Sequence, residues 1–168
     1  AKKDIPDKVI AMKRKYSALN IKYGRPLGIH PKILKVCCER IETAESNSVS
    51  STTRADTLLM TVAHGSSDPD TNSTTAKVSQ MLLKSMEFGG SETSFIGANQ
   101  PLLSEALEAS IKKGFKRTIV FPYFLFNGVL TQRIASIVDD IQKKYPEVEL
   151  LKAQYLSHHE LIIDVFME

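Results

Sequence analysis

The sequence predicts an α/β protein in which a parallel sheet is flanked by helices. Two stretches, residues 58–63 and 118–126, are almost continuously apolar, which is typical of strands buried on both faces of a parallel sheet. Segments with the apolar period of helices alternate with these strands, and the connections between them are short. Such alternation favours helices on both faces of one sheet.

Apolar spacing and helix-breaking residues place the individual elements. Asp4 is a suitable N-cap for a first helix, with Pro6 in its first turn, and Pro31 opens a second helix. Residues 44–56 are rich in Ser and Thr, which predicts a polar linker. Helices are expected at residues 5–16, 31–42, 72–86, 101–113, 130–144 and from 160, and strands at 19–23, 58–63, 93–97, 117–126 and 148–154.

An internal repeat relates the two ends of the sequence. Residues 1–39 align without a gap on residues 130–168, an offset of 129, and nine positions are identical. Ordinary composition would give roughly two or three identities by chance. The identical pairs are Ile5/Ile134, Val9/Val138, Lys15/Lys144, Tyr16/Tyr145, Leu27/Leu156, His30/His159, Ile33/Ile162, Val36/Val165 and Glu39/Glu168.

The repeat predicts an internal duplication of two similar halves. Residues 1–43 would be the end of the first half, residues 44–56 the linker, and residues 57–168 the second half. Coincidence between two units of the same architecture is the alternative.

The composition excludes several classes of protein. The net charge is +3 and the 22 Lys and Arg residues are scattered, so no nucleic-acid partner is expected. No apolar run approaches the roughly 20 residues that span a bilayer, and no hydrophobic signal segment opens the sequence, so we expect a cytoplasmic protein without membrane contact. Cys37 and Cys38 are neighbours on a helix and cannot readily bridge each other, so free thiols are expected. The Gly-rich nucleotide-binding patterns are absent from the sequence.

The strongest candidate for chemistry is the segment that follows the strand at 58–63, because ligands bind at the carboxyl ends of parallel strands. His64 lies there, and an imidazole can bind a transition metal or take up a proton near neutral pH. Gly65 permits an unusual turn, and Ser66, Ser67 or Asp68 can cap the next helix, whose free N–H groups favour carboxylates. A hydrogen-bonded structural histidine is the alternative at position 64.

Three further segments would meet the same edge of the sheet, at residues 95–103, 122–130 and 155–160. The aromatic segment 122–130 can form a wall against a flat ring, with plain sheet core as the alternative. His30 and His159 are equivalent in the repeat and each precedes a helix, which fits helix capping better than metal binding.

Together these segments resemble the class II chelatase family, the CbiX-type proteins that insert cobalt or iron into sirohydrochlorin. The resemblance rests on His-Gly-Ser-Ser-Asp-Pro at 64–69, Pro-Tyr-Phe-Leu-Phe at 122–126 and Leu-Gly-Ile-His-Pro at 27–31. Asp-Ile-Pro at 4–6 and the segment 23–31 resemble the close of the family's first half, and the likeness covers nearly the whole chain outside the linker.

The resemblance implies a chelatase-like fold and a lyase of cobalamin or sirohaem synthesis, a sirohydrochlorin cobaltochelatase or ferrochelatase. The metal would be the substrate, Co²⁺ in preference to Fe²⁺, and no nucleotide or organic cofactor would be needed. His64 matches the family's first active-site histidine, which makes it the expected catalytic and metal-binding residue. The expected tetrapyrrole contacts are Gly65, Ser66, Ser67, Phe126, Asn127 and Gly128. The expected partners are sirohydrochlorin and a missing N-terminal half of the same protein, with a homodimer as an alternative assembly.

The sequence departs from the family's pattern at two places. Val129 occupies the position of a second histidine, and Ile96-Gly97-Ala98-Asn99 stands where the family commonly has an acidic residue. The alternative function is therefore a non-catalytic tetrapyrrole-binding or structural half whose sister half performs metallation.

Overall fold

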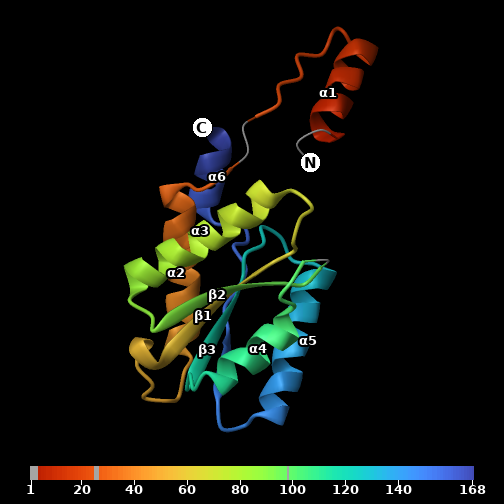
Figure 1. Cartoon of the computed structure of the whole chain (residues 1–168). Coiled ribbons are helices and arrows are strands. Elements are labelled where there is room, and N and C mark those ends of the chain that lie inside the picture. Colours follow the sequence, from red (N-terminus) through yellow and green to blue (C-terminus); the bar gives the residue numbers. More distant parts are fainter. Residues whose placement is uncertain (1–3, 25–26, 98) are drawn as a thin grey trace.

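The fold is a four-stranded parallel sheet between two layers of helices (Figure 1). The computed structural model describes residues 4–24, 27–97 and 99–168. The strand order is β2-β1-β3-β4, and every neighbouring pair is parallel. The elements are α1 (Asp4–Lys15), α2 (Pro31–Ser46), the 3₁₀ turn η1 (Arg54–Asp56), β1 (Thr57–Ala63), α3 (Pro69–Met86), β2 (Gly90–Phe95), α4 (Leu103–Lys112), β3 (Arg117–Pro122), α5 (Val129–Lys144), β4 (Glu149–Lys152) and α6 (Glu160–Met167).

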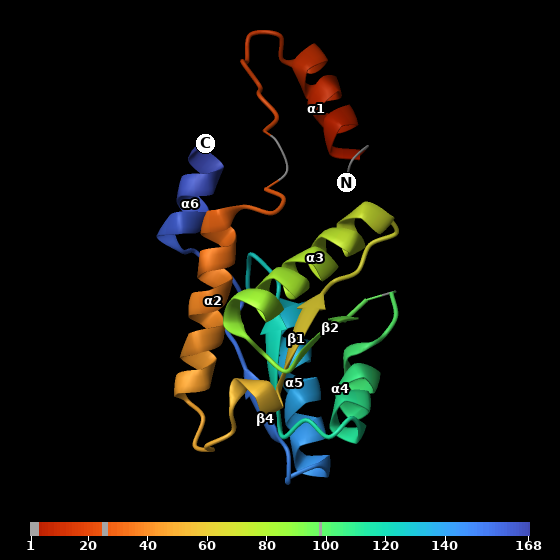
Figure 2. The same cartoon turned by 60° about the vertical axis from the view of Figure 1, so that its left-hand side comes forward.

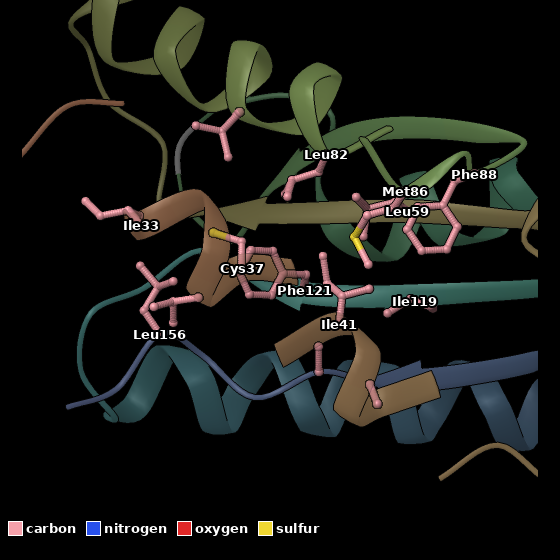
Figure 3. Close-up of a cluster of buried hydrophobic side chains, with 14 of the residues drawn as sticks. Ile33, Cys37, Ile41, Leu59, Leu82, Met86, Phe88, Ile119, Phe121 and Leu156 are labelled. Atoms are coloured by element: carbon pink, nitrogen blue, oxygen red, sulfur yellow. The ribbon is translucent and has the colours of Figure 1, made fainter. Parts of the chain in front are cut away.

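The central strands explain why the apolar runs in the sequence are continuous. All seven residues of β1 and all six of β3 are buried, because helices cover both faces of the sheet. Successive side chains of β1 point to opposite faces. Leu59 packs with α2 and α3 on one face, whereas Met60 packs with α4 and α5 on the other. Figure 3 shows the first of these two clusters, in which Cys37 and Ile41 of α2 lie against Phe121 and Ile119 of β3.

Most predicted elements are confirmed, with ends that shift by a few residues. The predicted strand at 117–126 ends earlier, at Pro122. Its neighbour β1 pairs only as far as Val62 with Pro122, and β4 ends opposite Val120. The Tyr123 amide still donates to the Val62 carbonyl, but the strand pairing of β3 extends no further than Pro122. The free Cys37 and Cys38 are confirmed, the first buried and the second half-buried. The capping predicted for the Asp4 side chain lies outside the described residues.

The strand predicted at residues 19–23 is wrong, because Leu19 is a bend and residues 20–23 have no regular secondary structure. Its equivalent in the repeat, β4, is a strand because β3 lies beside it and supplies hydrogen-bond partners. The amides of Leu19 and Ile21 instead bond locally, to the carbonyls of Tyr16 and Leu19. The preceding helix α1 lies apart from the sheet in both views (Figure 1, Figure 2).

The predicted linker at 44–56 is more ordered than its composition suggests. Its first residues complete α2 and its last three form η1. Between them, Ser48 and Ser50 donate hydrogen bonds to the two carboxylate oxygens of Glu149, at 2.6 and 2.7 Å. The segment is therefore tied to the amino end of β4.

A cluster of charges closes the amino edge of the sheet. The buried Arg117 donates to Thr57 Oγ1 at 3.0 Å, and its guanidinium lies 3.4 Å from Glu45 and 4.0 Å from Glu149. Arg54 holds Glu45 from the other side, with Nη2 2.6 Å from Oε2. Glu45 belongs to α2, so these contacts fasten α2 to the sheet, and they lie at the opposite end from the candidate site.

Candidate functional site

An open cleft of about 650 Å³ lies at the carboxyl edge of the sheet, where β1 ends. Its volume is in the range of small-molecule sites. The exposed side chain of His64 lines it, as predicted from its place directly after a buried strand. The lining residues are Leu27, Gly28, Ile33, Ala63, His64, Gly65, Ser66, Asp70, Thr71, Asn72, Thr74, Thr75, Tyr123, Phe124, Leu125 and Leu156.

The turn after His64 is held by side chains of α3. Gly65 has a φ of +89°, a left-handed conformation that favours glycine. Asn72 accepts a hydrogen bond from the Ser66 amide at 3.0 Å and donates one to the Ser66 carbonyl at 2.8 Å. The carboxylate of Asp68 caps α3 by accepting from the Asp70 amide at 3.2 Å. His64 is thus presented by a short, internally bonded turn.

Gly97 lies directly against His64. A Cβ on Gly97 would meet the His64 carbonyl oxygen at 2.5 Å and its ring Nε2 at 3.3 Å. A Cβ on Gly65 would meet Asn99 Oδ1 at 2.5 Å. The two glycines therefore let the segments that follow β1 and β2 approach closely, and position 97 has no room for a side chain.

Apolar and aromatic groups form the opposite wall of the cleft. Tyr123, Phe124 and Leu125 follow the end of β3, and burial raises the pKa of the Tyr123 hydroxyl, so that it stays protonated. Leu27 and Gly28, which precede α2 in the sequence, complete this side. The wall offers an apolar surface beside the polar side chains of α3.

The cleft brings together only part of the predicted site. Gly65 and Ser66 line it with His64, whereas Ser67 is exposed beside it. Phe126 is 73% exposed and lies outside the lining. Asn127 instead lines a smaller cavity of about 280 Å³ next to α5, and Gly128 is the N-cap residue of that helix. Asn127 Oδ1 accepts hydrogen bonds from the Gly128 amide and from a hydroxyl of α5.

Potential metal ligands are sparse around the cleft. Within residues 4–24, 27–97 and 99–168, no three His, Cys, Asp or Glu side chains converge as a metal cluster. Val129, where the resemblance implies a second histidine, is 79% exposed, and its alkyl side chain supplies no metal ligand. His30 and His159 cap α2 and α6 through Nδ1, each accepting an amide hydrogen bond at 3.2 Å, which confirms the capping interpretation. Among the histidines of the described residues, His64 is therefore the one whose side chain lines the cleft.

Sequence reasoning missed two contributions to the site. Asn72 lies eight residues after His64, and its only signal was its place in the first turns of a helix that follows a glycine turn. Leu27 and Gly28 are separated from His64 by the linker, and the repeat assigned them to another half. Only the packing of α2 on this sheet brings them to the cleft.

The sequence matches the CbiX family over residues 1–44 and 58–168. The chain belongs to this family. It is 34% identical over 164 residues to the sirohydrochlorin cobaltochelatase of Priestia megaterium, covering 98% of this chain and 53% of that protein. It is 28% identical over 160 residues to a sirohydrochlorin ferrochelatase of the same organism, covering 95% of this chain and 58% of that protein.

The fold of this CbiX homologue is also found in a solved structure, that of SirB from Bacillus subtilis with Fe³⁺. The TM-score is 0.79 at 24% sequence identity, over 99% of this chain and 63% of SirB. The chain thus spans somewhat more than half the length of the relatives that it matches. No helix in the described part of this CbiX chain is long and apolar enough to cross a membrane.

Proposed function

We propose that this CbiX chain takes part in inserting a divalent metal into sirohydrochlorin, with Co²⁺ preferred over Fe²⁺ and His64 as the catalytic and metal-binding residue. The observation that carries the proposal is the exposed His64 imidazole in a 650 Å³ cleft at the carboxyl edge of the sheet. The highest identity among the relatives named above is to a cobaltochelatase, which supports cobalt.

The chemistry requires a metal ligand and a proton acceptor in one place. Insertion forms four bonds from pyrrole nitrogens to the metal and releases two N–H protons. A neutral imidazole can hold Co²⁺ or Fe²⁺ through its free nitrogen before transfer, or take up one of these protons and pass it to water. No nucleotide is required, because chelation by the macrocycle drives the exchange. His64 is exposed to solvent, so the proton has a route out of the cleft.

The two sides of the cleft suit different parts of a carboxylate-bearing macrocycle. The turn at Gly65, Ser66 and Ser67 leads into α3, and the amino end of a helix favours carboxylates. The apolar wall at 123–125 suits a ring face. We place Phe126, Asn127 and Gly128 at the rim, just beyond that wall, as further contacts of the substrate.

The proposed arrangement has two similar halves, the second of which comprises residues 57–168. The share of the relatives that the chain covers, 53–63%, supports a further half beside the one described. In this arrangement residues 1–43 belong to the end of the first half and residues 44–56 join the two.

A second candidate function is a non-catalytic half that holds the tetrapyrrole while its sister half performs metallation. The exposed Val129 favours it, because one imidazole without a second ligand is a weak anchor for a divalent ion.

Metallation of sirohydrochlorin by His64→Ala separates the two functions. The rate is followed as the absorbance change of sirohydrochlorin on adding Co²⁺ or Fe²⁺, with the 168-residue chain assayed together with its sister half. If His64 acts as metal ligand or base, its loss should lower the rate about 100-fold or more. His158→Ala is the matched control, since His158 is also exposed but lies outside the cleft lining. An unchanged rate in His64→Ala would assign metallation elsewhere and favour the binding half.

A further inference from the structure

The apolar wall of the cleft is continued by the turn that precedes α6. Leu156 lines the cleft together with Phe124, and the Leu156 amide donates to the Phe124 carbonyl at 2.9 Å. Residues 157–159 then lead directly into α6. The place of this turn and the place of the wall are linked by that backbone hydrogen bond, so a displacement of the turn would move the wall.

Ser157, within this turn, has a left-handed backbone. Its φ is +60°, a conformation that glycine adopts freely and other residues do not. For a serine the cost is about tenfold in population. The Ser157 hydroxyl lies 3.1 Å from Nδ1 of the neighbouring His158, a contact that does not tie the turn to another element. The conformation therefore depends on contacts from outside the turn.

Two consecutive residues of α2 supply such contacts. Glu39 Oε2 lies 2.9 Å from His159 Nε2, and Arg40 Nη2 donates to the Leu156 carbonyl at 3.2 Å. His159 Nδ1 accepts the Leu161 amide, so Nε2 carries the proton and donates it to the carboxylate. The turn is thus held at both of its ends by α2, which lies beside α6 in Figure 2.

The turn that precedes α2 provides a comparison within the same chain. Gly28 is equivalent to Ser157 in the repeat, and its φ of +57° costs a glycine nothing. His30 caps α2 as His159 caps α6, and His30 Nε2 lies 3.1 Å from Glu168 Oε2. Two histidine–carboxylate pairs of the same kind therefore accompany turns that differ in the residue that carries the left-handed backbone.

We propose that Glu39 is a positioning residue for the cleft, acting through His159. The bond between them keeps the turn at 156–159 in its left-handed form, and this turn sets the place of Leu156 in the wall. The proposal rests on the function proposed above, since the ligand that meets the wall is then the face of the sirohydrochlorin ring. Glu39 does not line the cleft, so it acts on substrate binding and not on proton or metal transfer. Glu168 has no such role, because a glycine turn keeps its form unaided.

Binding of metal-free sirohydrochlorin, followed by its absorbance, tests the proposal on the 168-residue chain together with its sister half. Glu39→Ala should weaken binding about 3- to 10-fold, the usual effect of losing one hydrogen bond. Glu39→Gln should bind as the parent does, because its amide oxygen still accepts the His159 Nε2 proton. In metallation, Glu39→Ala should raise KM while kcat stays within about twofold, since the wall meets the ring equally in the ground state and the transition state.

The matched control is Glu168→Ala, which removes the same kind of pair beside the glycine turn. It should change sirohydrochlorin binding by less than about twofold, because the pair is exposed and the turn needs no support. A double-mutant cycle with Ser157→Gly tests the cause. Since glycine is stable at positive φ, adding Glu39→Ala to the Ser157→Gly chain should weaken binding by less than about twofold.

Hydrogen exchange of the Leu156 and Leu161 amides reports on the turn without any substrate. Both amides should exchange faster in Glu39→Ala, and at the parental rate in Glu39→Gln and Glu168→Ala. The proposal is overturned if Glu39→Ala exchanges or binds sirohydrochlorin as the parent does, or if Ser157→Gly leaves its binding defect unchanged. If the parent binds no sirohydrochlorin although Glu39→Ala speeds exchange, the proposed function fails and the positioning role fails with it.

Discussion

Replacing Gly97 by alanine probes how closely His64 is held to the neighbouring strand end. The new Cβ would lie 2.5 Å from the His64 carbonyl oxygen and 3.2 Å from its ring Cδ2. The first of these contacts is with backbone, so it cannot be relieved by rotating a side chain. The substitution therefore acts on the position of His64 without removing its imidazole.

The size of the effect follows from the distance. Ordinary contact begins at about 3.4 Å, so the two atoms must separate by about 0.9 Å. Overpacking of this kind costs typically 1–3 kcal/mol, and we expect about 2 kcal/mol. For a chain of this size that lowers Tm by about 4–8 °C. A shift of about 1 Å in a reacting group can cost about 100-fold in rate, so metallation should fall by a similar factor if His64 takes part.

Thermal unfolding of Gly97→Ala beside Gly24→Ala measures the first effect. A Cβ at Gly24 meets nothing within 4 Å, so that variant should stay within about 0.5 kcal/mol of the parent. The close approach of the two strand ends would be refuted if Gly97→Ala melted within about 1 °C of the parent. If Gly97→Ala were as stable as the parent and metallated sirohydrochlorin at the full rate, the position of His64 would not matter for the reaction.

Two further predictions concern stability away from the cleft. Arg117→Met should lower the free energy of unfolding by about 3 kcal/mol in chemical denaturation, because Glu45 and Glu149 would stay partly buried without the positive charge of Arg117. As the control, Lys143→Met at an exposed ion pair should change it by less than about 0.5 kcal/mol. Equal effects of the two substitutions would contradict the reasoning. Burial raises the pKa of the Cys37 thiol above its ordinary value of 9.0, so the folded state keeps a proton that the unfolded state loses above that pH. The free energy of unfolding should therefore fall as pH rises above 9.0, and Cys37→Ala should reduce that slope; a slope unchanged by the substitution would exclude the thiol as its source.

The parallel sheet could be predicted from the sequence alone, because strands that are buried on both faces are almost continuously apolar. Apart from the ion-paired Arg117 at the start of β3, the strands β1 and β3 contain only apolar residues and threonines, and both strands are buried throughout. The place of His64 was equally readable, since a residue that directly follows a buried parallel strand emerges at the carboxyl edge. The repeat further marked His30 and His159 as helix-opening residues, and their capping bonds agree.

The tertiary structure alone decided which segments meet at the cleft and which stay uncovered. Whether residues 19–23 form a strand depends on a neighbouring strand, which no local propensity records. The wall at Leu27 and Gly28 depends on the packing of α2, which precedes β1 in the chain, onto this sheet. The need for glycine at position 97 is visible only in the structure, where a Cβ there would lie 2.5 Å from the His64 carbonyl oxygen. The local spacing of apolar residues therefore predicts where most helices and strands lie. The residues that line the cleft depend on packing between segments far apart in the chain, which short-range spacing does not encode.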